Sequence, residues 1–131
     1  GDVYKRQIGS MHLVGSVEDK HAIIIDDIID TAGTLCEATK VLKERGALTV
    51  TSFATHGIFS GKALSNIQNS VLDQVIVTNS IPAKENEIEL SNHKITRLSV
   101  APILAEAIFR IQTRTSISSL FTLPKSTDKS G

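Results

Sequence analysis

The sequence predicts an α/β protein, with a parallel sheet flanked by helices, and three observations support this fold class. Short runs of branched apolar residues alternate along the chain with segments of helical period. The order strand, loop, helix occurs twice, which implies parallel strands joined by right-handed crossovers. Hydrophobic residues make up 40% of the 131 residues, enough for one buried core.

The first strand and helix occupy residues 22–46. Residues 22–25, Ala-Ile-Ile-Ile, are typical of a strand that is buried on both faces of a parallel sheet. Gly46 falls where a left-handed C-terminal helix cap is expected. Between them, the helix has an apolar face made of Leu35, Ala38, Val41 and Leu42.

The remaining elements follow at short intervals. We expect strands at residues 48–54, 74–78 and 94–98, and a short helix at 62–68. Ser99 is expected to cap a last helix, with Pro102 in its first turn, where the missing N–H donor is harmless. That helix has a continuous apolar stripe of Val100, Ile103, Leu104, Ala107, Ile108 and Ile111.

Composition and charge limit the classes of partner and the compartment that we expect for this chain. Lys plus Arg and Asp plus Glu number 14 each, so charge gives no reason to expect nucleic acid or an anionic membrane. No apolar run approaches the roughly 18–20 residues of a membrane span. The single Cys36 suits a reducing compartment, and we expect a cytoplasmic protein. We interpret residues 1–10 as a non-matching leader of foreign or misjoined origin, 11–122 as the domain, and 123–131 as a disordered tail.

The most informative motif follows the first strand. Its residues are Asp26, Asp27, Asp30, Thr31, Ala32, Gly33 and Thr34. Small side chains before a helix let a ligand approach the unpaired amides of the first turn, which suit phosphate. Carboxylates accept hydrogen bonds from sugar hydroxyls or hold a hard cation such as magnesium. The motif therefore predicts a site for a phosphorylated sugar.

A purely structural interpretation exists for each residue alone. Asp30 or Thr31 could cap the helix, while Asp26 and Asp27 are solvated at the end of a strand. The complete arrangement after a buried strand favours a ligand. Its spacing does not fit the haloacid-dehalogenase nucleophile, an ordinary nucleotide phosphate loop or a calcium loop.

Residues 23–34 resemble the phosphoribosyl pyrophosphate signature of the type I phosphoribosyltransferase-like fold. Further motifs resemble, in order and spacing, the C-terminal half of the ribose-phosphate pyrophosphokinases. They are Met-His-Leu-Val-Gly (11–15), Thr-His-Gly-Ile-Phe-Ser-Gly (55–61), Val-Thr-Asn-Ser-Ile-Pro (77–82), Leu-Ala-Glu-Ala-Ile (104–108) and Ser-Ile-Ser-Ser-Leu-Phe (116–121). The resemblance covers residues 11–121.

This resemblance implies an enzyme that converts ATP and ribose 5-phosphate into phosphoribosyl pyrophosphate and AMP, for nucleotide biosynthesis. It implies that Asp26 and Asp27 hold the ribose hydroxyls and magnesium. It also implies that Asp30, Thr31, Ala32, Gly33 and Thr34 wrap the 5-phosphate. Because a carboxylate repels phosphate, we expect Asp30 to order the loop by capping instead.

The resemblance has further consequences outside the acidic loop. It implies a homo-oligomer and a regulatory site at Ser116, Ser118 and Phe121, although Ser116 is equally a helix cap and Phe121 a core anchor. His56 and Ser60 line a nucleotide or inter-subunit surface, or Ser60 caps the short helix. Most of the ATP site belongs to an N-terminal half that is not visible before Met11. We therefore expect this chain alone to bind ribose 5-phosphate weakly or not at all, without turnover.

Two alternative functions remain, and the first of them shares the acidic loop. A phosphoribosyltransferase would consume phosphoribosyl pyrophosphate, but it needs a base-binding hood that nothing here resembles. A non-catalytic, synthetase-associated regulatory subunit would assemble with the enzyme. Such relatives tend to lose the acidic loop, which is intact in this sequence.

Overall fold

The computed structural model describes residues 5–8 and 11–122, with side chains from Gly15 onward. The chain divides into two compact units, with the boundary between Leu98 and Ser99, and each unit is described by itself. The tail expected at 123–131 lies outside the described residues, as do parts of the expected leader.

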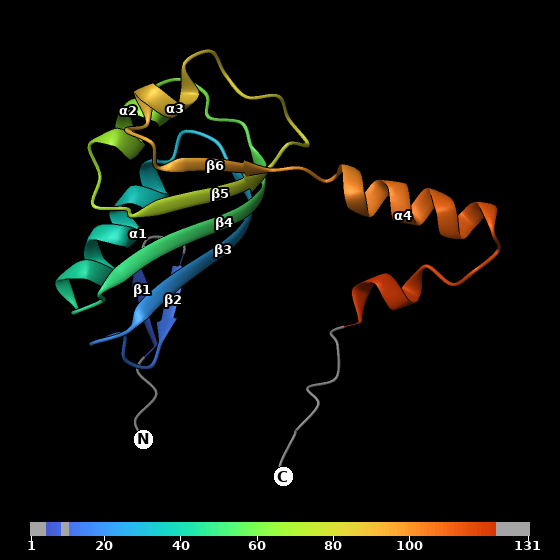
Figure 1. Ribbon diagram of the computed structural model, residues 1–131. Coiled ribbons are helices and arrows are strands. Elements are labelled where there is room, and N and C mark those ends of the chain that lie inside the picture. The colour runs from blue at the N-terminus through green and yellow to red at the C-terminus, as the bar shows by residue number, and fades with distance from the viewer. Residues whose placement is uncertain (1–4, 9–10, 123–131) are drawn as a thin grey trace, which may run out of the picture. The chain divides into compact units, whose positions relative to one another are not determined.

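The first unit contains a hairpin and a four-stranded parallel sheet (Figure 1). Strands β1 (Lys5–Ile8) and β2 (Met11–Val14) pair antiparallel, although no strand was predicted in the expected leader. The sheet runs in chain order through β3 (His21–Ile29), β4 (Thr49–Gly57), β5 (Gln74–Thr78) and β6 (Ile95–Leu98). All of its neighbouring strands are parallel, which confirms the predicted α/β fold class.

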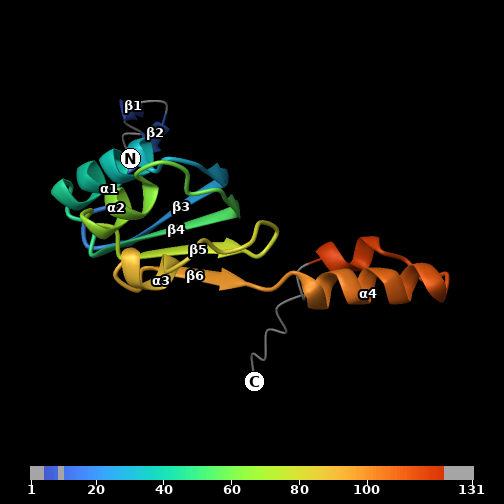
Figure 2. The same ribbon diagram turned by 90° about the horizontal axis from the view of Figure 1, so that it is seen from above.

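Three helices connect successive strands of the sheet. They are α1 (Gly33–Glu44), α2 (Ala63–Gln68) and α3 (Glu87–Leu90), and Figure 2 shows α1 and α2 over the same face. Helix α1 ends as predicted, because Gly46 has a φ of 93° and its N–H donates to the Lys43 carbonyl over 3.0 Å. The N–H of Ala47 donates to the Leu42 carbonyl over 3.1 Å, which completes a Schellman cap.

The core lies between these helices and one face of the sheet. Its fully buried side chains include Val50, Val75, Val77, Phe59, Ile67 and Leu72. The prediction that residues 22–25 are buried on both faces is wrong. Ile24 is 6% exposed beneath the helices, but Ile23 and Ile25 are 62% and 81% exposed on the opposite face. Successive side chains of a strand alternate, and no helix of the first unit, as far as it is described, covers that second face.

A buried ion pair between Arg97 and Glu87 connects the ends of neighbouring strands. The guanidinium of Arg97, on β6, contacts the Glu87 carboxylate at 2.8 Å, and both side chains are almost enclosed. The same guanidinium donates to the backbone carbonyls of Gly57, Thr78 and Ile81 over 3.0, 3.2 and 2.8 Å. Arg97 therefore joins β6 and α3 to the ends of β4 and β5 and to the loop that follows β5.

The second unit contains α4 (Ala101–Gln112) and the 3₁₀ turn η1 (Ser118–Phe121). Helix α4 begins with Pro102 in its first turn, as predicted. Its N-cap is Val100 rather than Ser99, whose hydroxyl instead accepts the Ala101 N–H over 3.2 Å. The predicted apolar stripe is present but exposed, for example 56% at Ile103 and 67% at Ile108. No helix within the described residues is long and apolar enough to cross a bilayer.

Candidate functional site

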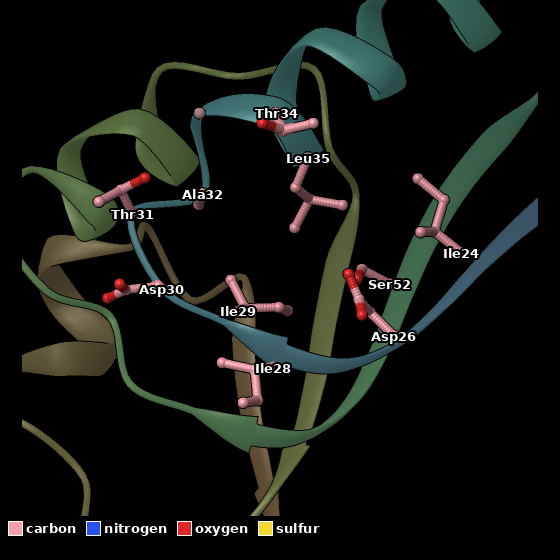
Figure 3. Close-up of a pocket in the computed structure, with 11 residues that line it drawn as sticks. Ile24, Asp26, Ile28, Ile29, Asp30, Thr31, Ala32, Thr34, Leu35 and Ser52 are labelled. Atoms are coloured by element: carbon pink, nitrogen blue, oxygen red, sulfur yellow. The ribbon is translucent and has the colours of Figure 1, made fainter. Parts of the chain in front are cut away.

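A cavity of about 290 Å³ opens at the carboxyl end of β3, beside the start of α1. It is lined by Ile24 and Asp26 of β3, by residues 28–35, and by Ser52 of β4 (Figure 3). The carboxyl edge of a parallel sheet is where ligands of such folds usually bind. Six of the seven residues that the sequence singled out, all except Asp27, line this one cavity.

The two adjacent acids, Asp26 and Asp27, are part of β3 rather than the loop after it. The strand was expected to end at Ile25, but it continues pairing with β4 as far as Ile29 and Gly57. Side chains of neighbouring strand residues point to opposite faces. Asp26 therefore lines the cavity with Ile24, whereas Asp27 is not among its described lining residues, although the two carboxyls remain within hydrogen-bond reach of each other.

Short local hydrogen bonds hold both acids. The Asp27 N–H donates to Asp26 Oδ1, and the Ile28 N–H donates to Asp27 Oδ1, each over 2.8 Å. The hydrogen bond with the Asp26 carboxyl and the one from Ile28 lower the pKa of Asp27 below its usual value. Asp27 therefore carries its negative charge at neutral pH, on an exposed strand edge.

The loop between β3 and α1 has an unusual backbone at Ala32. This residue is the N-cap of α1 and adopts a left-handed conformation, with φ 64° and ψ 8°, although it is not glycine. Its carbonyl accepts the Cys36 N–H over 3.0 Å, which starts the helix. No side chain of the described residues caps α1, so the alternative of Asp30 or Thr31 as its cap is wrong. The first amides of α1, at Gly33 and onward, have no intrahelical acceptor and border the cavity.

Polar contacts from the next crossover hold this loop in place. The Ser60 hydroxyl donates to the Asp30 carboxylate, so Ser60 does not cap α2, whose N-cap is Lys62. The Asn66 side-chain amide donates to the Thr31 carbonyl over 3.0 Å. Asp30 therefore orders the loop, as we expected, but through Ser60 instead of by capping. Its carboxylate lies well apart from that of Asp26 (Figure 3).

His56 lies near the same edge of the sheet but outside the described lining of the cavity. Its side chain is half-buried, and its Nδ1 is 2.7 Å from the Ser80 hydroxyl. The Ser80 hydroxyl also donates to the Thr55 carbonyl over 3.2 Å. This arrangement orients the imidazole and joins the ends of β4 and β5.

The predicted regulatory residues belong to the second unit. The hydroxyls of Ser116 and Ser118 are 2.6 Å apart, and the Arg110 guanidinium donates to the Ser116 carbonyl over 3.0 Å. Arg110 also pairs with Glu106 at 2.9 Å. Phe121 is 76% exposed, so the alternative role of a core anchor is wrong.

A metal site formed by the protein alone would need several ligating side chains close together. No three His, Cys, Asp and Glu side chains of the described residues gather closely enough to hold a metal ion. Magnesium usually takes only one or two carboxylates from a protein and completes its shell with water and substrate phosphates. Asp26 and Asp27 supply two carboxylates, so their chemistry is compatible with a magnesium ion that is otherwise held by water and phosphate oxygens.

Sequence reasoning missed two residues at this site. Asn66 lies in a segment with the pattern of an ordinary helix and Ser52 in one with the pattern of an ordinary strand. Nothing in their spacing indicated a role at the site. Ser60 was found only through the motif at residues 55–61, without its contact to Asp30.

Comparison with known proteins identifies the family. The model described as "Phosphoribosyl synthetase-associated domain" matches residues 2–122. Ribose-phosphate pyrophosphokinases of Coxiella burnetii and Vibrio parahaemolyticus are 48% and 53% identical over 111 residues, which is 85% of this chain but 34% and 35% of theirs. The crystal structure of phosphoribosylpyrophosphate synthetase from Mycobacterium smegmatis matches with a TM-score of 0.67 and 36% identity, over 79% of this chain and 34% of that one.

This chain thus spans about a third of the length of the relatives it matches. The family match covers most of the chain, and the structural match agrees with the parallel sheet. The chain belongs to the phosphoribosyl synthetase-associated domain family and is homologous to ribose-phosphate pyrophosphokinases.

Proposed function

We propose that this chain is the ribose 5-phosphate-binding part of a ribose-phosphate diphosphokinase. The complete enzyme would transfer diphosphate from ATP to the anomeric hydroxyl of ribose 5-phosphate, giving phosphoribosyl pyrophosphate and AMP. One observation carries the proposal: a single cavity combines the Asp26 carboxylate with the open first turn of a helix. A polyol with a phosphate group presents the complementary groups, which are hydroxyl donors and an anion.

The two sides of the cavity bind different parts of the ligand in this proposal. The amides of Gly33 and Thr34, together with the hydroxyls of Thr31 and Thr34, bind the 5-phosphate. Asp26 accepts hydrogen bonds from the ribose hydroxyls. The left-handed Ala32 keeps the amides turned toward the phosphate, and the Ser60 contact to Asp30 keeps the loop folded before the ligand arrives.

Magnesium and ATP complete the proposal. Asp26 and Asp27 would hold magnesium together with phosphate oxygens, and the ion would neutralise charge on the diphosphate being transferred. Phosphoryl-type transfer depends mainly on positioning and charge neutralisation. This chain positions the sugar, and most ATP contacts come from the N-terminal half of the full-length protein. The full-length protein is a homo-oligomer in this proposal. We propose the cytoplasm as its location, and neither nucleic acid nor a membrane as a partner.

A second candidate is a non-catalytic subunit that assembles with the synthetase. The description of the matching family model, a synthetase-associated domain, favours it. The intact acidic loop favours the enzyme instead. Co-sedimentation with an active synthetase, without a contribution to its turnover, would support the subunit. The phosphoribosyltransferase alternative has no observation in its favour.

A titration followed by NMR tests the proposal on the chain itself. Ribose 5-phosphate is added to the ¹⁵N-labelled chain up to tens of millimolar. Because the cavity is present in this chain by itself, the expectation of weak or absent binding narrows to weak binding, in the millimolar range. We expect the amides of residues 30–35 to shift, with smaller shifts for ribose, which lacks the phosphate. AMP should not be released when ATP and magnesium are added. Shifts confined to the second unit, or none at all, would overturn the proposal.

A further inference from the structure

The hydroxyl of Ser52 is the one buried side-chain polar atom without a hydrogen-bond partner among the described residues. The residue is 0% exposed, in the middle of β4. Buried hydroxyls are normally paired, because an unpaired one has lost its bonds to water without replacement. Its neighbours on the same face of the strand, Val50 and Ala54, are apolar and buried. An alanine would suit this position better if packing were the only requirement.

Ser52 lies next to the Asp26 carboxylate at the wall of the cavity. In the register of the sheet, Ser52 pairs with Ile24, and Asp26 pairs with Ala54. Ser52 and Asp26 are therefore diagonal neighbours on one face of adjacent strands. Both line the cavity beneath Leu35, and Figure 3 shows their side chains together.

The Asp26 carboxylate lines the cavity, and one of its oxygens is held by its own strand. Its Oδ1 accepts the N–H of Asp27 over 2.8 Å, at an exposed position where water can replace it. Rotation about the Cα–Cβ bond would release that N–H to solvent and free this oxygen of the carboxylate within the cavity. It would then come within reach of the Ser52 hydroxyl, which has no other partner to give up.

We propose that Ser52 is a positioning residue for Asp26. When a hydroxyl-bearing ligand occupies the cavity, the Ser52 hydroxyl donates to one oxygen of the Asp26 carboxylate, and the other oxygen accepts the ligand's hydroxyl. The inference rests on the proposed function, since it requires a sugar phosphate in this cavity. The Ser52 hydroxyl makes no hydrogen bond in the ligand-free fold, so we expect its effect to be confined to the sugar side of the ligand.

The test compares Ser52→Ala with the wild-type chain by NMR titration with two probes. We expect Ser52→Ala to weaken binding of ribose 5-phosphate about tenfold, as for loss of a hydrogen bond to a charged group. Binding of inorganic phosphate should be unchanged, because the phosphate side of the cavity is intact. The unfolding midpoint of the variant should be equal to or above that of wild type.

Two further variants separate positioning from a structural role. Ser52→Thr keeps the hydroxyl and should bind ribose 5-phosphate within threefold of wild type. In an Asp26→Asn background, Ser52→Ala should have no further effect on affinity. Equal affinity of Ser52→Ala and wild type would overturn this inference alone. Equal weakening toward both probes, or additive effects with Asp26→Asn, would also overturn it. Failure of the wild-type chain to bind ribose 5-phosphate would overturn the proposed function, and this inference with it.

Discussion

Replacing Arg97 with methionine should be among the most destabilising substitutions in the first unit. Arg97 is 11% exposed and Glu87 4%, so the variant leaves a carboxylate buried without its cation. Three backbone carbonyls lose a charged donor at the same time. Breaking a buried pair from one side costs about 3–5 kcal/mol, which is a large part of the stability of a small domain.

Urea unfolding measures this effect. With a denaturant dependence of about 2 kcal/mol per molar, a loss of about 4 kcal/mol lowers the midpoint by about 2 M. Replacing both partners, as Arg97→Met with Glu87→Leu, should recover part of the loss, because no charge is then left unpaired. The control is Lys43→Met, which removes a half-exposed ion pair with Asp73 and should cost about 1 kcal/mol or less. An Arg97→Met variant no less stable than this control would refute the reasoning.

Three more predictions concern other contacts of the first unit. Gly57→Ala places a methyl group 2.7 Å from the Phe59 ring. This overpacking should lower the free energy of unfolding, measured by thermal unfolding, by roughly 1–3 kcal/mol. Unchanged stability would show that the ring moves freely. Burial raises the pKa of Asp73, but hydrogen bonds from a backbone N–H and a lysine outweigh this and lower it below the usual 3.8. Its contribution to stability is therefore present above about pH 4 and lost as the pH falls through the lowered pKa, so Asp73→Asn should flatten the acid limb of a pH–stability profile. Ser60→Ala removes the donor to Asp30 and should speed amide hydrogen exchange in residues 30–34, while exchange in β5 stays unchanged.

Local patterns predicted the elements whose cause is local. The strand at residues 74–78 matches β5, and the glycine cap at residue 46 and the short second helix also agree with the structure. In these cases, the hydrophobic period and the turn chemistry are enough to define an element. The four-residue helix α3 has too few residues to show a period, and it was missed.

Non-local contacts explain the errors. The sequence ends the apolar run of β3 at Ile25, but pairing with β4 carries the strand on through the acids to Ile29. Burial on both faces depends on what covers the sheet, which the strand itself does not encode. The resemblance grouped Asp26 with Asp27, but only Asp26 is among the described lining residues of the cavity. The sequence did not predict the unpaired hydroxyl of Ser52, since small residues are common in buried strands.

Of the two acids, only Asp26 is among the described lining residues of the cavity, and this difference gives the most direct test of the proposed site. Ribose 5-phosphate is titrated into the wild-type chain, Asp26→Asn and Asp27→Asn, in buffer without divalent cations, and the dissociation constants are obtained from NMR shifts. If the cavity grips the sugar through Asp26, that variant should bind about tenfold more weakly, while Asp27→Asn stays within threefold of wild type. Equal affinity of all three chains, or a larger loss in Asp27→Asn, would contradict a sugar site built on this cavity.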